Sequence, residues 1–267
     1  MTPSDRLGQN LDLFWFGEDR ADSRLLRQLL DGDRIPRCWI PPQQVLEHRA
    51  LLQLYHDLRR EHTAWIQRIH AVCFHQGTTQ LGTGAVSAEA GRARLRQVAA
   101  GQLSAAGQLQ VTTYLQMPQT LEGHIAGLRR RLLAAARHLR GPKVLTEQLY
   151  GVGPVTALAL TCWLGGAGRF SSSRRAVGFA GLDVTVYSSD GKRSPGRLSR
   201  QGPPVLRWCL YEAGKAHSHA SAPDHPYYTR VKDRVDGKRA AISEARKILR
   251  QACHILTDLG DDAFAPV

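Results

Sequence analysis

Two adjacent serines beside a run of cations are the residues best suited to chemistry in this sequence. Ser188 and Ser189 follow residues 184–187, whose alternating pattern predicts a strand, and residues 188–193 then predict a turn. Basic residues around a hydroxyl can hold a phosphodiester and stabilise the charge that develops when it is attacked. A serine in a turn is, however, more often only structural. The basic residues concerned are Lys192, Arg193, Arg197, Arg200 and Arg207.

A glycine turn is the second candidate for binding phosphate. Gly151 and Gly153 flank Val152, and Pro154 then begins a predicted helix that carries Thr156. Glycine allows positive φ and close approach of the backbone, and the free N–H groups at a helix start favour a phosphate. The turn resembles the hairpin of helix-hairpin-helix DNA-binding proteins, although such turns are more often structural. It is not a dinucleotide-binding fingerprint, because no strand precedes it and the third glycine is absent.

Two carboxylates near the N-terminus are the third candidate. Asp19 and Asp22 lie three residues apart at the start of a helix predicted over residues 20–30. This spacing puts both on one helical face, where they could bind Mg²⁺ as hard oxygen ligands. The same pattern is also common on solvated helices.

The composition favours a polyanionic partner. The 267 residues carry a formal net charge of +13, and the isoelectric point is about 10.1. Neutralising phosphates releases counterions, which gives affinity for nucleic acid independent of base sequence. The alternative is a basic composition set by ribosome association or by an arginine-favouring genome.

Cysteine usage and hydropathy point to a cytoplasmic protein. The five cysteines show no Cys/His pairing with metal-ligand spacing, so neither structural zinc nor a disulfide framework is predicted. The N-terminus lacks a signal-peptide pattern, and no stretch approaches the roughly 18 apolar residues of a membrane span. The cysteines are Cys38, Cys73, Cys162, Cys209 and Cys253.

Long helices should position these candidates in a mainly α fold. Within residues 36–144, periodic apolar residues predict a long amphipathic helix over residues 45–72 and a second over residues 112–140. A smaller helix is expected near residues 88–99. The long helices suggest an antiparallel coiled-coil arm, and plain helix packing is the alternative.

The amino-acid composition and the length of the predicted elements change after the long helices. Residues 145–267 contain short elements rich in Gly and Ser, then two basic helices over residues 204–217 and 237–259. We expect a compact helical domain with the helix-hairpin-helix-like turn and a small β-hairpin near residues 184–189. Sheet beyond that hairpin is not expected.

Ordered motifs in this second region resemble the C-terminal domain of the transposase family of insertion sequences 110, 116 and 902. The similarity covers residues 150–259 and implies an insertion-sequence recombinase that binds DNA and cleaves and rejoins its strands. The family's nucleophile is the serine two residues beyond a tyrosine, which here is Ser189 and not Ser188. The glycine turn, Thr156, Tyr187 and the five basic residues would then contact DNA. The matching motifs begin at Gly151, Arg169, Phe179, Tyr187 and Leu206.

Residues 19–26 resemble a segment of the family's ribonuclease-H-like nuclease domain. The resemblance makes Asp19 and Asp22 two of four catalytic carboxylates, with Mg²⁺ bound only if that site is complete. Gly17 and Glu18 stand where the family has Lys and Thr. Because the other two carboxylates belong upstream, we expect an N-terminally truncated member whose residues 1–35 are a nuclease remnant. The alternative is a catalytically inactive, nucleic-acid-binding fragment.

The resemblance also implies partners. Family members use a structured noncoding guide RNA besides DNA, act as homo-oligomers and would be nucleoid-associated. The basic C-terminal residues could contact that RNA, or they could form a solvated helix face. These residues are Lys232, Arg234, Lys238, Arg239, Arg246, Lys247 and Arg250.

Overall fold

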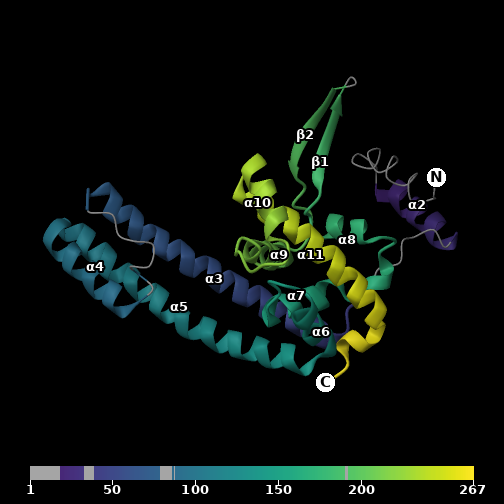
Figure 1. The fold of residues 1–267 in the computed structure, drawn as a ribbon, viewed down its shortest axis with the longest axis horizontal. Helices are drawn as coiled ribbons and strands as arrows, with labels where there is room; N and C mark the ends of the chain where they lie inside the picture. The colour runs from purple at the N-terminus through teal and green to yellow at the C-terminus, as the bar shows by residue number, and fades with distance from the viewer. Residues whose placement is uncertain (1–18, 33–38, 79–85, 87, 190–191) are drawn as a thin grey trace. The chain divides into compact units, whose positions relative to one another are not determined.

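The structure, a computed structural model, describes residues 19–32, 39–78, 86, 88–189 and 192–267. The described part is mainly α-helical with one two-stranded sheet (Figure 1), which confirms the predicted fold class. The chain divides into two compact units, one through Ile40 and one from Pro41 onward. No helix within the described residues is long and apolar enough to cross a membrane.

The first unit contains one described helix, α2 (Asp19–Asp31). It matches the helix predicted over residues 20–30. Near its end, Arg27 and Asp31 form an exposed ion pair at 3.8 Å, one turn apart.

The second unit begins with a pair of long helices, α3 (Gln43–His75) and α5 (Ala105–His138), which lie antiparallel and pack against each other (Figure 1). The short helix α4 (Glu89–Gln102) packs on α5. At that end, Leu95 from α4 joins Ile69 and Leu115 in a shared apolar core. All three helices were predicted. Whether the long pair forms a coiled-coil arm stays a prediction.

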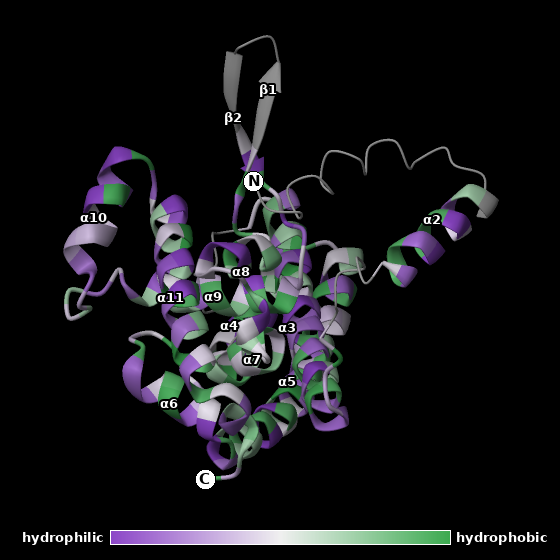
Figure 2. Cartoon of the chain, turned by 90° about the vertical axis from the view of Figure 1, so that its right-hand side faces the viewer, coloured by the Kyte–Doolittle hydropathy of each residue, from purple (hydrophilic) through white to green (hydrophobic). Residues whose placement is uncertain are grey.

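The short helices of the second unit surround α7 (Pro154–Leu164), whose residues Ala157 to Leu164 are all buried. A helix that is apolar on every side needs neighbours all round. In Figure 2 the surrounding helices alternate green hydrophobic stretches with purple hydrophilic ones. Arg49 of α3 donates two hydrogen bonds, of 3.0 and 2.8 Å, to the Cys162 carbonyl, and so ties the long helices to α7. Besides the long helices, α7 contacts α6 (Arg140–Gln148), α9 (Pro204–Ala216) and α11 (Gly237–Leu259). The helix α10 (His225–Arg234) and the 3-10 turns at Ala167–Arg169 and Gly260–Phe264 pack on α11.

The sheet is an antiparallel hairpin of β1 (Val184–Ser189) and β2 (Lys192–Leu198), which follows the short helix α8 (Ser173–Phe179). The hairpin was predicted, but its turn is shorter than expected. Pairing runs to the last possible partners, Ser189 opposite Lys192, so both serines lie in the strand. Only residues 190 and 191 separate the strands, and both lie outside the described residues. Two-residue connections are the commonest in hairpins because their twist matches that of the strands.

A candidate nucleic-acid interface

The stem of the hairpin is fixed to the helices by backbone contacts. Gly181 (φ 66°) and Gly202 (φ 131°) both adopt left-handed conformations, and a Cβ on Gly202 would collide with the carbonyl of Phe179. Such positions favour glycine. Arg246 of α11 donates a 2.7 Å hydrogen bond to the Leu182 carbonyl, at the entrance to β1. The hairpin is therefore anchored between α8 and α11.

A cationic pocket of about 720 Å³ opens beside this stem, between α8 and α11. Its wall contains four arginines and a single carboxylate. Burial and the neighbouring Arg250 lower the pKa of Arg246, and Asp183 partly offsets this. Arginine presents a planar set of donors that matches phosphate oxygens. The lining residues are Ser172, Arg174, Arg175, Val177, Gly178, Asp183, Val184, Arg246 and Arg250.

The predicted nucleophile lies at the end of β1. Ser189 pairs with Lys192, and Ser188 pairs with Arg193. Tyr187 pairs with Ser194, one step closer to the stem. The structure thus brings the predicted serine, tyrosine and two cations together at one end of the hairpin. The described part includes their backbone but not their side chains.

The other three predicted cations lie along β2 and beyond it. Arg197 and Arg200 are exposed. Arg207, in α9, donates hydrogen bonds of 2.8 Å to the Gly202 carbonyl and 3.3 Å to the Ala180 carbonyl. Its pKa is lowered by burial and by Arg200. Arg207 therefore orders the loop beneath the hairpin.

The glycine turn packs against the end of α9. Gly151 has φ 78°, and a Cβ there would lie 2.7 Å from the Ala213 carbonyl oxygen. Gly153 caps α7 and is exposed. Thr156 faces inward, because its hydroxyl hydrogen-bonds the buried Cys209 thiol. The turn thus has a packing role at Gly151, and the helix-hairpin-helix function stays a prediction.

The two N-terminal aspartates do not complete a magnesium site in the described residues. Asp19 and Asp22 lie one turn apart on α2, as the spacing predicts. The side chain of Asp19 is outside the described part. Asp22 belongs to no group of three potential metal ligands among the residues described. Since Mg²⁺ takes near-octahedral oxygen coordination, two carboxylates supply at most part of a site.

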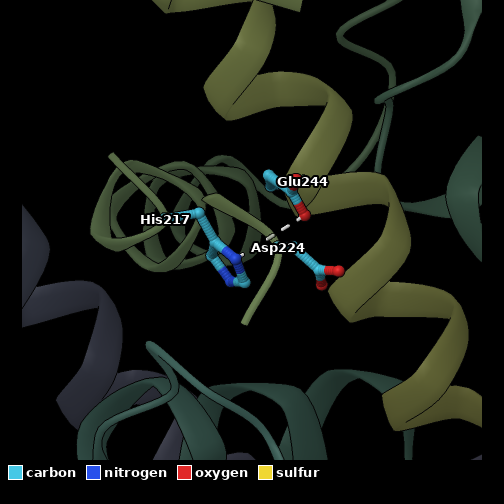
Figure 3. A group of neighbouring side chains, drawn as sticks. All are labelled: His217, Asp224 and Glu244. Carbon is cyan, nitrogen blue, oxygen red and sulfur yellow. Dashed lines mark ion pairs between the residues drawn. The ribbon is translucent and has the colours of Figure 1, made fainter. Parts of the chain in front are cut away.

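A buried cluster of His217, Asp224 and Glu244 was not predicted. Its ligand atoms, one from each residue, all lie within 4.8 Å of one another. Figure 3 shows His217 and Glu244 facing each other from α9 and α11. The three residues come from separate segments, so no short spacing pattern links them. One feature of the sequence indicates that Glu244 is buried. It lies four residues from Ala240 and from Ile248, on the apolar face of α11.

Burial dominates the electrostatics of this cluster. It raises the pKa of Glu244 to about 7, with a further rise from Asp224 and an opposing effect of Lys247. It lowers the pKa of His217, while the Tyr150 carbonyl and Asp224 raise it and Lys247 lowers it further. The Tyr150 carbonyl lies near the His217 ring but makes no well-aligned hydrogen bond with it. Neither ring nitrogen of His217 has a hydrogen-bond partner in the described structure.

The part of the chain that carries the hairpin matches a known protein family. Residues 144–229 match the model of the transposase IS116/IS110/IS902 family. These residues make up about a third of the chain, and over that length the chain is similar to this transposase family. A probable family 20 transposase of Pseudomonas aeruginosa is 33% identical over 100 residues, which are 37% of this chain and 29% of that protein. The match therefore spans less than a third of the relative's length. The predicted resemblance to the transposase family is confirmed for this segment.

The matched segment, residues 144–229, contains only part of each charged site. It contains the glycine turn, the hairpin with Ser189, and two cluster residues, His217 and Asp224. The helix α11 begins beyond residue 229 and supplies the third cluster residue, Glu244. It also supplies Arg246 and Arg250 to the cationic pocket.

Proposed function

We propose that this transposase-family chain cleaves and rejoins DNA strands through Ser189. The observation that carries the proposal is the place of Ser189 at the last paired position of β1, opposite Lys192. The same hairpin leaves the helices beside a pocket with four arginines. We infer that the serine and the cations at the end of the hairpin carry out phosphoryl transfer, while the arginines at the stem hold the DNA.

The proposed step exchanges one phosphate ester for another. The Ser189 oxygen attacks phosphorus, a bond between phosphorus and a deoxyribose oxygen breaks, and the strand end stays linked as a phosphoserine ester. The serine proton passes to a base, and the departing oxygen leaves as a hydroxyl. A strand hydroxyl then attacks the phosphoserine and releases the serine, so bond energy is conserved without a nucleotide cofactor. We infer that a nuclease-like domain supplies the base, as the family resemblance implies.

The cations have two roles in this proposal. Lys192 and Arg193, paired with the serines, offset charge on the phosphate under attack, and Tyr187 positions it. The pocket arginines hold the flanking backbone of the nucleic acid. The exposed basic residues of α10 and α11 extend this surface and would contact a guide RNA. A homo-oligomer would bring several such surfaces to one DNA.

A covalent adduct tests the nucleophile. The chain is incubated with end-labelled DNA that carries an insertion-sequence end, alone and, in a parallel reaction, with a nuclease-like domain of the same family. Denaturing electrophoresis should then show a protein–DNA adduct. Ser189→Ala should abolish the adduct, and Ser188→Ala, one residue earlier in β1, should retain it. An adduct that survives Ser189→Ala, or no adduct even with the nuclease-like domain present, would contradict the proposal.

Binding without cleavage is the second candidate function. One observation favours it: the pocket residues lie on α8, α11 and the hairpin stem, so nucleic acid can bind there without Ser189. The same experiment separates the two functions. Equal DNA affinity of wild type and Ser189→Ala, without an adduct from either, would establish binding alone.

A further inference from the structure

The cluster of His217, Asp224 and Glu244 contains buried polar atoms that no other group satisfies. The side chains of His217 and Glu244 are 4% and 0% exposed. Neither ring nitrogen and neither carboxylate oxygen has a hydrogen-bond partner within the described structure. The closest approach between them, His217 Nδ1 to Glu244 Oε2, is 3.8 Å. Buried polar groups are nearly always paired, so a further group is expected between these two.

The distances fit a small cation. One ligand atom from each of the three residues lies within 4.8 Å of the others. Ligands at about 2.1 Å from a tetrahedral metal ion are roughly 3.4 Å apart, so closure needs shifts of about 1 Å. The donor set is one imidazole nitrogen and two carboxylates. Imidazole suits Zn²⁺, and the two carboxylates also suit Mn²⁺, which binds nitrogen and oxygen ligands more strongly than Mg²⁺ or Ca²⁺ does.

We propose that His217, Asp224 and Glu244 bind a divalent transition metal ion, Zn²⁺ or Mn²⁺. The ion would connect the residue that ends α9, the residue that precedes α10 and the middle of α11. Because two of the three ligands are buried, its role is structural. This inference is independent of the strand-exchange function, since Ser189 takes no part in it.

Lys247 is the partner of one of the three ligands, Asp224, when no metal is bound. Its amino group lies 2.6 Å from Asp224 Oδ1. In Figure 3 the Asp224 carboxylate is turned aside, while His217 and Glu244 face each other. Binding the ion requires Asp224 to leave Lys247, so the lysine competes with the metal. The Tyr227 ring, 5.8 Å from the Lys247 nitrogen, remains as a neighbour for the released cation.

The glycine turn closes the site on the other side. The Tyr150 ring meets the His217 ring edge-on, with centroids 5.3 Å apart. Metal-binding histidines usually direct their second nitrogen at a carbonyl or carboxylate, which fixes the ring orientation. The Tyr150 carbonyl lies near the His217 ring, and a small rotation of the ring would let it accept from that second nitrogen. The ion would therefore hold the glycine turn, α9, α10 and α11 together.

Metal binding by the full chain tests the proposal directly. The chain is stripped with EDTA and titrated calorimetrically with ZnCl₂, MnCl₂ and MgCl₂ in separate experiments. We expect about one Zn²⁺ or Mn²⁺ per chain and no Mg²⁺. His217→Ala and Glu244→Gln should each weaken binding by about 100-fold or more. His219→Gln, an exposed histidine two residues from His217, should bind as wild type does. Absence of Zn²⁺ and Mn²⁺ binding, or binding unchanged in Glu244→Gln, overturns the site.

Thermal unfolding separates a metal ligand from a merely structural residue. In EDTA, Glu244→Gln removes a buried acid without a partner, so its Tm should equal or exceed that of wild type. With saturating ZnCl₂ or MnCl₂, wild type should gain about 5 °C and the variant nothing. The order of the two melting temperatures therefore reverses with metal. The same order in both buffers contradicts the proposal.

A gain of affinity gives a second test, which does not depend on a destabilised variant. Lys247→Gln removes the cation that holds Asp224. The variant should bind the metal several-fold more tightly than wild type. Weaker binding would show that Lys247 does not compete with the ion and would count against the site.

Discussion

The helix α11 takes part in two charged sites that differ in their exposure to water. Arg250 is exposed and lines the cationic pocket with Arg246, whereas Glu244, two residues before Arg246, is completely buried beside His217. Water solvates the exposed guanidinium, so it needs no partner within the chain. The buried carboxylate and imidazole have lost that solvation and have no hydrogen bonds in the described structure to replace it.

This difference separates two kinds of binding. An exposed cationic surface attracts any polyanion, and salt weakens the attraction. A buried set of ligands is much less screened, and its selectivity depends on ligand type and geometry. The pocket should therefore respond to ionic strength and to removal of charge. The cluster should respond to the identity of the metal and to single-atom substitutions.

The largest expected effect on stability comes from forcing α9 away from α11, the helix that both sites share. Gly214 of α9 packs so closely on α11 that a Cβ would collide with the Ala241 carbonyl. Gly214→Ala should lower the free energy of unfolding by about 3 kcal/mol, measured by urea denaturation. Gly178→Ala, in α8 beside the pocket, is the control, because a Cβ there meets no described atom within 4 Å. It should be neutral or stabilising by up to about 1 kcal/mol. Equal stability of both variants would show that α9 and α11 need not stay in contact.

A smaller effect is expected from removing charge at the pocket. Arg174 and Arg250 are exposed there and come from α8 and α11. The double variant Arg174→Gln/Arg250→Gln should bind duplex DNA about tenfold more weakly near physiological salt. It should also reduce the slope of log affinity against log salt by about 2. Fluorescence anisotropy across a KCl series measures both quantities.

Arg94 provides a matched control for that experiment. It is exposed on α4, at the far end of the long helices. Arg94→Gln removes the same charge and should leave the salt slope within about 0.5 of wild type. If it weakens binding as much per charge as the pocket variant does, net charge alone accounts for the affinity.

Local patterns in the sequence predicted most of the fold. Apolar periodicity located the long helices, and the alternation at residues 184–187 located β1. The ordered motifs identified the transposase family. The extent of the hairpin was underestimated, because serine and glycine favour turns while strand pairing depends on the partner strand. That pairing puts Ser188 and Ser189 in β1.

The tertiary partners of charged residues could not be predicted from the sequence. Arg207 fits a DNA-binding pattern, yet its guanidinium donates to carbonyls of the chain's own loop. His217 and Glu244 are 27 positions apart, and only the packing of α9 on α11 brings them together. Spacing rules find ligands that lie on one helix or turn, whereas this cluster depends on how separate elements pack.

The contrast between the two sites requires that water is excluded from the interior beside α9. The reactivity of the buried cysteines tests this without any change to either site. Burial raises the pKa of Cys162 and Cys209 to about 12, so both thiols stay protonated at neutral pH. Cys209 lies on α9, two turns before His217. At pH 8 only about one thiol in ten thousand would be ionised, and the thiolate is the reactive form.

Iodoacetamide labelling followed by mass spectrometry measures this protection. Cys38 lies outside the described residues, so the experiment uses a Cys38→Ser background. At pH 8, Cys162 and Cys209 should alkylate more than about 1,000-fold slower than a free thiol, and urea should abolish the protection. Rapid alkylation of Cys209 in the folded chain would mean that water reaches the interior beside α9. His217 and Glu244 would then have solvent as their partner, and the need for a metal ion between them would disappear.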